Sequence, residues 1–224
     1  MGIKHTDSPS FPPREIPSIV YVDPAGVRKP IRRVTYNGVQ IWPSWAWTDD
    51  FNRSTLGANW TITNGGAAIV MLDSKAVRRS AVTGSTDIYT TVDRAPADNF
   101  TLEAGVYSVQ DPAQISAVLF GSPAQYVYAE VSRNSWTLGI YNGSTWTILA
   151  SGGSTGLAAG NTIVLSRVGT SISLEVGGVL LATRTQAAGV AMGPGNRRLG
   201  LSVRVDKPFW GTFYSPDIDY IRVK

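Results

Sequence analysis

The chain contains no cysteine and only one histidine, and these shortages exclude several classes of protein. Without cysteine there is no disulfide framework and no cysteine-ligated metal. The single imidazole, His5, stands in a segment rich in proline and serine near the N-terminus. We therefore expect neither serine–histidine catalysis nor a histidine-rich zinc site.

Long hydrophobic runs are also missing. No stretch approaches the roughly 18 consecutive apolar residues of a membrane-spanning helix, so we expect no membrane insertion. Residues 1–7 lack the apolar segment of a secretion signal. A protein that works outside its cell without such a signal would have to leave by another route, for example on lysis.

Charge is sparse and evenly spread. Charged residues make up 16% of the 224 residues, and the formal net charge is +4. The basic residues occur as scattered pairs such as Arg78-Arg79 and Arg197-Arg198. A nucleic-acid site usually shows a denser basic stripe with aromatic residues between the charges. We predict no nucleic-acid partner.

Paired carboxylates for catalysis are absent as well. The glutamates are Glu15, Glu103, Glu130 and Glu175, and each stands alone in its segment. Hydrolysis of a glycoside usually needs two carboxylates about 5–10 Å apart. The chain also has no phosphate-binding loop and no nucleophile elbow. We predict that the protein is not an enzyme; Glu103 and Glu130 could still meet across neighbouring strands.

What the chain does have is alternation of apolar and polar residues between turns. Residues 125–131 place Val127, Ala129 and Val131 on one face and Tyr126, Tyr128 and Glu130 on the other. Residues 100–109, 171–176 and 199–205 alternate in the same way, and turn formers such as Asn142-Gly143 lie between such segments. About a dozen short strands at this spacing predict an all-β sandwich.

The pattern divides the chain into three parts. Residues 1–15, with three prolines, are expected to be a flexible tail. Residues 16–46 carry turn signals at Asp23–Gly26 and Asn37-Gly38 and predict a small β unit of about three strands. Such a unit buries little surface alone, so it should need a partner chain or the next domain. Residues 47–224 form the main domain.

Three tryptophans, Trp42, Trp45 and Trp47, lie close together at the boundary between these parts. Two interpretations remain open. The cluster is either packing at a domain junction or a platform on which sugars stack.

Two segments of the main domain resemble a known family. Thr48–Thr61, with the pattern DDFNR…LG.NW, is similar to the opening of concanavalin A-like, laminin-G-type jelly rolls in tail proteins of phages that infect actinobacteria. Asp217–Lys224 resembles the closing strand of the same domains, and Val34–Pro43 resembles a short module that precedes them in minor tail proteins. The resemblance covers about residues 31–224.

The resemblance implies a jelly-roll domain in the tail tip or tail fibre of a virion. Residues 1–46 would attach the protein to other phage tail proteins, and the jelly roll would bind a glycan of the host cell wall. It further implies a homotrimer, carried on the virion and found outside the cell after lysis of the host. Two alternatives remain open: a structural decoration protein that binds no glycan, and a glycoside hydrolase.

The resemblance also raises the possibility of structural calcium. First and last strands are often neighbours in jelly rolls, which would bring Asp49 and Asp50 near Asp217 and Asp219. Clustered carboxylates repel one another unless a cation or an arginine lies among them, and calcium prefers oxygen ligands. In the alternative interpretation, Asp50 caps a turn and pairs with Arg53 or Arg222.

Candidate sugar-binding residues follow from alternation and turns. Aromatic side chains stack on the apolar faces of sugars, and polar groups bind the hydroxyls. The residues that meet these criteria are Tyr107, Tyr126, Tyr128, Glu130, Tyr141, Trp146 and Trp210. Cross-strand pairs that stabilise a sheet, or a subunit interface, would use the same residues.

Residues 208–214 form the most aromatic loop of the chain. We expect this loop to plug one end of the sandwich, to pack on a neighbouring subunit or to bind ligand, in that order of preference.

Overall fold

A computed structural model describes residues 20–22, 28–30, 35–36, 39–40, 45–64, 69–73, 75–185 and 190–224. The chain divides into two compact units, Met1–Ser44 and Trp45–Lys224. The described residues contain no helix, and therefore none that is long and apolar enough to cross a membrane.

The described residues of the first unit form two short antiparallel strand pairs. Strand β1 (Val20–Val22) pairs with β2 (Arg28–Pro30), and β3 (Thr35–Tyr36) pairs with β4 (Val39–Gln40). The predicted tail at residues 1–15 and the turn residues Asp23–Gly26 and Asn37-Gly38 lie outside the described residues.

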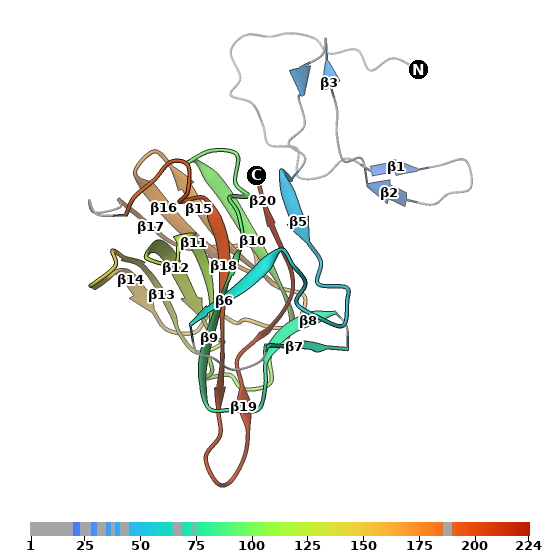
Figure 1. The fold of residues 1–224 in the computed structure, drawn as a ribbon, viewed down its shortest axis with the longest axis vertical. Coiled ribbons are helices and arrows are strands. Elements are labelled where there is room, and N and C mark those ends of the chain that lie inside the picture. The colour runs from blue at the N-terminus through green and yellow to red at the C-terminus, as the bar shows by residue number, and fades with distance from the viewer. Residues whose placement is uncertain are drawn as a thin grey trace. The chain divides into compact units, whose positions relative to one another are not determined.

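The second unit is a sandwich of two antiparallel sheets, so the all-β jelly-roll prediction is confirmed (Figure 1). We call the first the β10 sheet, in which the strand order is β17-β16-β15-β10-β20-β8-β7 and β5 also pairs with β20. Its strands are β5 (Trp47–Asp49), β7 (Ile69–Leu72), β8 (Ala76–Arg79), β10 (Phe100–Ser108), β15 (Thr162–Val168), β16 (Ser171–Val176), β17 (Val179–Thr185) and β20 (Asp217–Val223).

We call the second the β11 sheet, in which the order is β14-β13-β12-β11-β18-β9-β6 and β19 also pairs with β18. Its strands are β6 (Trp60–Asn64), β9 (Gly84–Thr90), β11 (Ser116–Ser122), β12 (Gln125–Val131), β13 (Trp136–Tyr141), β14 (Trp146–Gly152), β18 (Arg198–Asp206) and β19 (Phe213–Tyr214).

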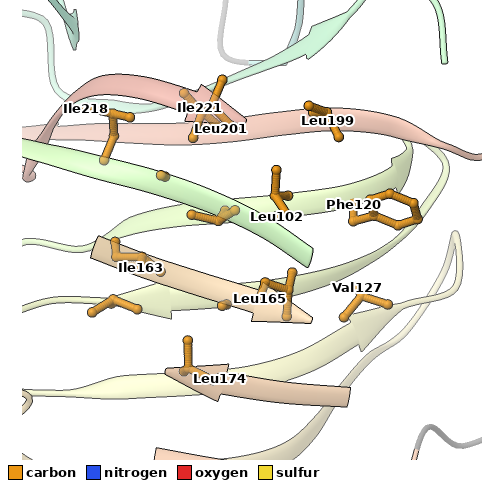
Figure 2. Packing of buried hydrophobic residues seen from close by; sticks show 14 of the residues in the cluster. Leu102, Phe120, Val127, Ile163, Leu165, Leu174, Leu199, Leu201, Ile218 and Ile221 are labelled. Atoms are coloured by element: carbon orange, nitrogen blue, oxygen red, sulfur yellow. The ribbon is translucent and has the colours of Figure 1, made fainter. Parts of the chain in front are cut away.

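The core lies between the two sheets, and each strand supplies alternate residues to it. Figure 2 shows Leu102 and Leu165 of the β10 sheet packed among Phe120 and Val127 of the β11 sheet. Phe100 stacks on Phe120, with 3.6 Å between ring centroids. Because the core takes every second residue, the remaining residues of each strand lie on the outer faces, where a ligand can reach them.

The segment Thr48–Thr61, which resembles the opening of a jelly roll, lies where the first strand of the domain pairs with its last strand. Strand β5 pairs with the closing strand β20, as expected for first and last strands. Phe51 and Trp60 are buried, with ring centroids 5.4 Å apart. These two residues anchor the opening of the sandwich in its core.

The tryptophans of the boundary that the structure describes have packing roles. Trp47 lies 6.0 Å from Trp60, between ring centroids, and packs against the core. The Trp45 ring lies beneath the Arg222 guanidinium, 4.2 Å from its centroid. These contacts favour the packing interpretation for both residues, whereas Trp42 lies outside the described residues.

Candidate functional site

Five of the seven predicted sugar-binding residues line one hollow on the outer face of the β11 sheet. They are Tyr126, Tyr128, Glu130, Tyr141 and Trp146. The hollow has a volume of about 470 Å³. We call it the tyrosine pocket.

Strand register brings the aromatic rings of this pocket together. Tyr126 of β12 lies opposite Tyr141 of β13, which lies opposite Trp146 of β14. The Trp146 ring is 4.6 Å from Tyr141, 5.6 Å from Tyr126 and 5.3 Å from Tyr128, between centroids. Three consecutive strands therefore supply one continuous aromatic cluster.

A glycine makes room for the floor of the pocket. Tyr128 lies opposite Gly139 on the neighbouring strand. A Cβ atom at Gly139 would lie 2.5 Å from Cζ of Tyr128, closer than real atoms approach. The Tyr128 ring can therefore lie across β13. Tyr126 and Tyr128 are buried as a floor, whereas Trp146 is 56% exposed and forms the rim.

The other end of the tyrosine pocket is polar and comes from strands for which no site residue was predicted. Asp87 of β9 lies opposite Ser202 of β18, and Arg204 follows on the same face. Asn64 Nδ2 donates a hydrogen bond to Asp87 Oδ2 over 3.1 Å. The signal for these residues was present in the sequence, since Ser85, Asp87 and Tyr89 alternate with buried Thr86 and Ile88.

Burial favours the neutral forms of two side chains of the pocket, Glu130 and Tyr128. Burial raises the pKa of Glu130, the charge of Asp87 raises it further, and Arg204 opposes the shift. Burial, assisted by Glu130, raises the pKa of Tyr128 to about 12. The Tyr128 hydroxyl therefore stays protonated at neutral pH, when it can both donate and accept hydrogen bonds.

The structure does not bring Glu103 to Glu130, so the open alternative in which they meet across neighbouring strands is wrong. Glu103 lies on β10 and Glu130 lies on β12, in different sheets. Glu103 Oε1 accepts hydrogen bonds of 2.6 Å from Tyr220 Oη and from Arg222 Nη2. Its carboxylate is held by residues of its own sheet.

Two predicted sugar-binding residues lie away from the tyrosine pocket. Tyr107 belongs to β10 and lines a second hollow with Asp50, Lys75 and Asp219. Trp210 lies at the tip of the hairpin between β18 and β19, which Figure 1 shows extending beyond the sandwich. Phe209 is 97% exposed and Trp210 is 68% exposed, so these two rings do not plug the sandwich.

The aspartates predicted to hold calcium fall into two groups. Asp49 accepts hydrogen bonds from Arg53 Nη2, at 2.8 Å, and Trp60 Nε1, at 2.7 Å. Asp217 forms two hydrogen bonds of 2.7 Å with the guanidinium of Arg78. Arginine already neutralises both carboxylates, so neither fits a calcium ion.

Asp50 and Asp219 have no such arginine partner among the described residues. Asp50 Oδ1 caps a turn by accepting the backbone N–H of Asn52, and Asp219 Oδ1 is buried without a hydrogen-bond partner in the described part of the chain. The turn cap agrees with the alternative interpretation, but Arg53 pairs with Asp49 and Arg222 pairs with Glu103.

Calcium takes six to eight oxygen ligands in proteins. The described residues contain no group of three or more acidic, histidine or cysteine side chains suited to a metal. A calcium site at Asp50 and Asp219 stays a prediction, and backbone carbonyls or water would have to complete it.

Comparisons with known proteins match this chain in structure but not in sequence. No family model matches the sequence, and no curated protein matches it. The carbohydrate recognition domain of Emp47p matches with a TM-score of 0.58 and 13% identity, over 80% of this chain and 94% of that one. The CBM2 module of the evolved Dit protein of Lactobacillus casei BL23 phage J-1 matches with a TM-score of 0.55 and 13% identity, over 80% of this chain and 94% of that one.

An enzyme has a similar fold as well. The apo Crh5 transglycosylase matches with a TM-score of 0.50 and 17% identity, over 80% of this chain and 83% of that one. At these identities the comparisons establish a shared fold over about 80% of this chain, and the fold serves both carbohydrate-binding domains and an enzyme.

Proposed function

We propose that residues 45–224 bind a glycan in the tyrosine pocket, as the adhesive domain of a phage tail protein. The observation that carries this proposal is the meeting of Tyr126, Tyr128, Tyr141 and Trp146 with Asp87 and Arg204 in one hollow. Aromatic faces stack on the C–H surfaces of a sugar ring, and the charged groups bind its hydroxyls.

The fold comparisons support the glycan part of this proposal. Emp47p has a carbohydrate recognition domain of similar fold, and the phage J-1 Dit module is a carbohydrate-binding module of a phage protein. The tail location rests on the resemblance of the Thr48–Thr61 segment, and residues 1–44 would attach the domain to other tail proteins. We further propose that the protein is a homotrimer, carried on the virion and released on host lysis.

The acidic residues of the tyrosine pocket come from strands that are not neighbours. The tyrosine pocket holds two carboxylates, Asp87 on β9 and Glu130 on β12. Strands β18 and β11 lie between them, so the two carboxylates come neither from one strand nor from neighbouring strands. Each glutamate of the chain also stands alone in its segment of the sequence. We therefore propose a binding protein rather than a hydrolase.

The experiment is a glycan array probed with the labelled full chain, followed by adsorption to actinobacterial cells and to isolated cell walls. Saturable binding to a defined set of glycans is the expected result. Failure to bind cells, walls and purified wall polysaccharides alike would contradict the proposal and favour a decoration protein. Release of reducing ends from cell walls would favour an enzyme instead.

A further inference from the structure

The floor of the tyrosine pocket contains a hydroxyl group that has no partner within the described part of the chain. Tyr89 of β9 is 1% exposed and lines the pocket, and its Oη atom forms no hydrogen bond there. Burying a hydroxyl without a partner opposes folding. The Oη atom is almost closed to solvent, so a ligand group reaches it only when the rings around it shift, and that contact would then remove the penalty.

Local packing holds the Tyr89 ring in place. Tyr89 lies opposite Gly200 on β18, and a Cβ atom at Gly200 would lie 2.8 Å from Cε1 of Tyr89. The glycine therefore lets the ring lie across β18 towards the middle of the sheet. On its other side the ring meets Tyr126, with 6.0 Å between centroids. These contacts fix the position of the ring and therefore of its Oη atom.

The surroundings of this hydroxyl suit a sugar ring. Asp87 precedes Tyr89 by two residues on the same face, and Ser202 lies opposite Asp87. Burial raises the pKa of Tyr89, and the neighbouring Tyr126 and Asp87 raise it further, so the phenol stays neutral. A neutral phenol, a carboxylate and a serine hydroxyl together offer donors and acceptors to the hydroxyl groups of one sugar.

We propose that Tyr89 is a specificity-determining residue of the tyrosine pocket, whose hydroxyl hydrogen-bonds a free hydroxyl of a sugar seated between Asp87 and Tyr126. This inference rests on the proposed glycan binding. A site built to pair a ligand hydroxyl discriminates strongly against an analogue without it, because its own buried group is then left unpaired. The pocket should therefore select sugars with a hydroxyl at this position over their deoxy counterparts.

The test compares the full chain with Tyr89→Phe, which keeps the ring and removes the hydroxyl. The matched control is Tyr214→Phe, on β19 and outside the tyrosine pocket. Each protein is probed on an oligosaccharide array and then titrated with the best-bound glycan and its monodeoxy analogues. We expect Tyr89→Phe to bind that glycan about tenfold more weakly, as for a lost hydrogen bond that leaves its partner unpaired. Tyr214→Phe should bind like the original chain.

The monodeoxy series identifies the partner of the hydroxyl. One deoxy analogue should bind the original chain poorly, and Tyr89→Phe should not distinguish it from the parent glycan. The melting temperature of Tyr89→Phe should equal or exceed that of the original chain, because the variant buries no unpaired hydroxyl.

Three results would overturn the inference, and they are distinguishable. Equal glycan affinity of Tyr89→Phe and the original chain would remove Tyr89 from recognition and leave the proposed glycan binding intact. A melting temperature of Tyr89→Phe clearly below that of the original chain would show that the hydroxyl is already paired in the free protein, for example with a buried water. Absence of binding by the original chain would defeat the proposed function, and this inference with it.

Discussion

Asp49 organises the opening of the sandwich through three neighbouring groups. Its carboxylate accepts hydrogen bonds from the backbone N–H of Phe51, from the indole of Trp60 and from the guanidinium of Arg53. Phe51 has a φ of 50°, which is uncommon for a residue with a side chain. The hydrogen bond from its N–H to Asp49 helps to hold this conformation. The residue pattern of the segment Thr48–Thr61 therefore has a structural explanation that needs no ligand.

We predict that Asp49→Asn destabilises the protein by about 2–4 kcal/mol, because it leaves a partly buried arginine without its charge partner. Chemical denaturation followed by tryptophan fluorescence measures the change. Asp50→Asn is the matched control, since the neighbouring carboxylate is exposed and caps only a turn. Equal stability of the two variants would contradict the role assigned to Asp49.

The same carboxylate makes stability depend on acid. Burial alone would raise the pKa of Asp49, but hydrogen bonds from Arg53, Trp60 and Phe51 outweigh it and hold the pKa below the unfolded value of 3.8. The stabilisation is therefore present above that value and is lost as pH falls through the lower, folded pKa. The original chain should lose more stability than Asp49→Asn between neutral pH and about pH 3.

Trp146 and Tyr128 should respond differently to replacement by alanine. Trp146 is exposed at the rim of the tyrosine pocket, so Trp146→Ala should weaken glycan binding about tenfold or more and change the melting temperature little. Tyr128 is buried, so Tyr128→Ala should cost about 3 kcal/mol of stability. Array binding and thermal melts measure both effects. Unchanged binding by Trp146→Ala would contradict stacking at the rim.

At the scale of elements, the β18–β19 hairpin carries two aromatic residues that contribute little to the core. Phe209 and Trp210 contact each other, with 4.7 Å between ring centroids, and both are exposed. We predict that Phe209→Ser with Trp210→Ser leaves the melting temperature within about 1 °C, because neither ring is removed from a packed site. A drop of several degrees would mean that the tip is packed against another part of the protein or another copy.

The second hollow on the β10 sheet offers a separate test of calcium. If Asp50 and Asp219 hold the ion, calcium should raise the melting temperature over that in EDTA, since a ligand that binds only the folded state stabilises it. Asp219→Asn should abolish the increase. An unchanged melting temperature would end the calcium hypothesis for these residues.

For the whole molecule, the division into residues 1–44 and 45–224 predicts that stability and the proposed glycan binding do not depend on residues 1–44. A chain of residues 45–224 should melt at the same temperature as the full chain and keep its glycan binding, because the core and the tyrosine pocket belong to this unit. If residues 1–44 carry the trimer contacts, light scattering should show a monomer after their removal. A shortened chain that fails to fold would contradict the division.

The sequence could predict the strands because burial on one side of a sheet imposes a period of two. Alternation placed β12 at Gln125–Val131 and β16 at Ser171–Val176, and both bounds agree with the structure. The same alternation put Tyr126, Tyr128 and Glu130 on one face, and a short turn kept Tyr141 and Trp146 close to each other. Local patterns were therefore sufficient to predict that these residues, which come from three consecutive strands, lie close together.

The rest of the site depended on which strands become neighbours. Asp87 and Arg204 are about 120 residues apart in the chain, and they share the tyrosine pocket because β9 pairs with β18. Tyr107 has the same alternation signal as Tyr126 but lies in the other sheet. Alternation determines the face on which a residue lies, but only the long-range pairing of strands decides which faces and residues meet.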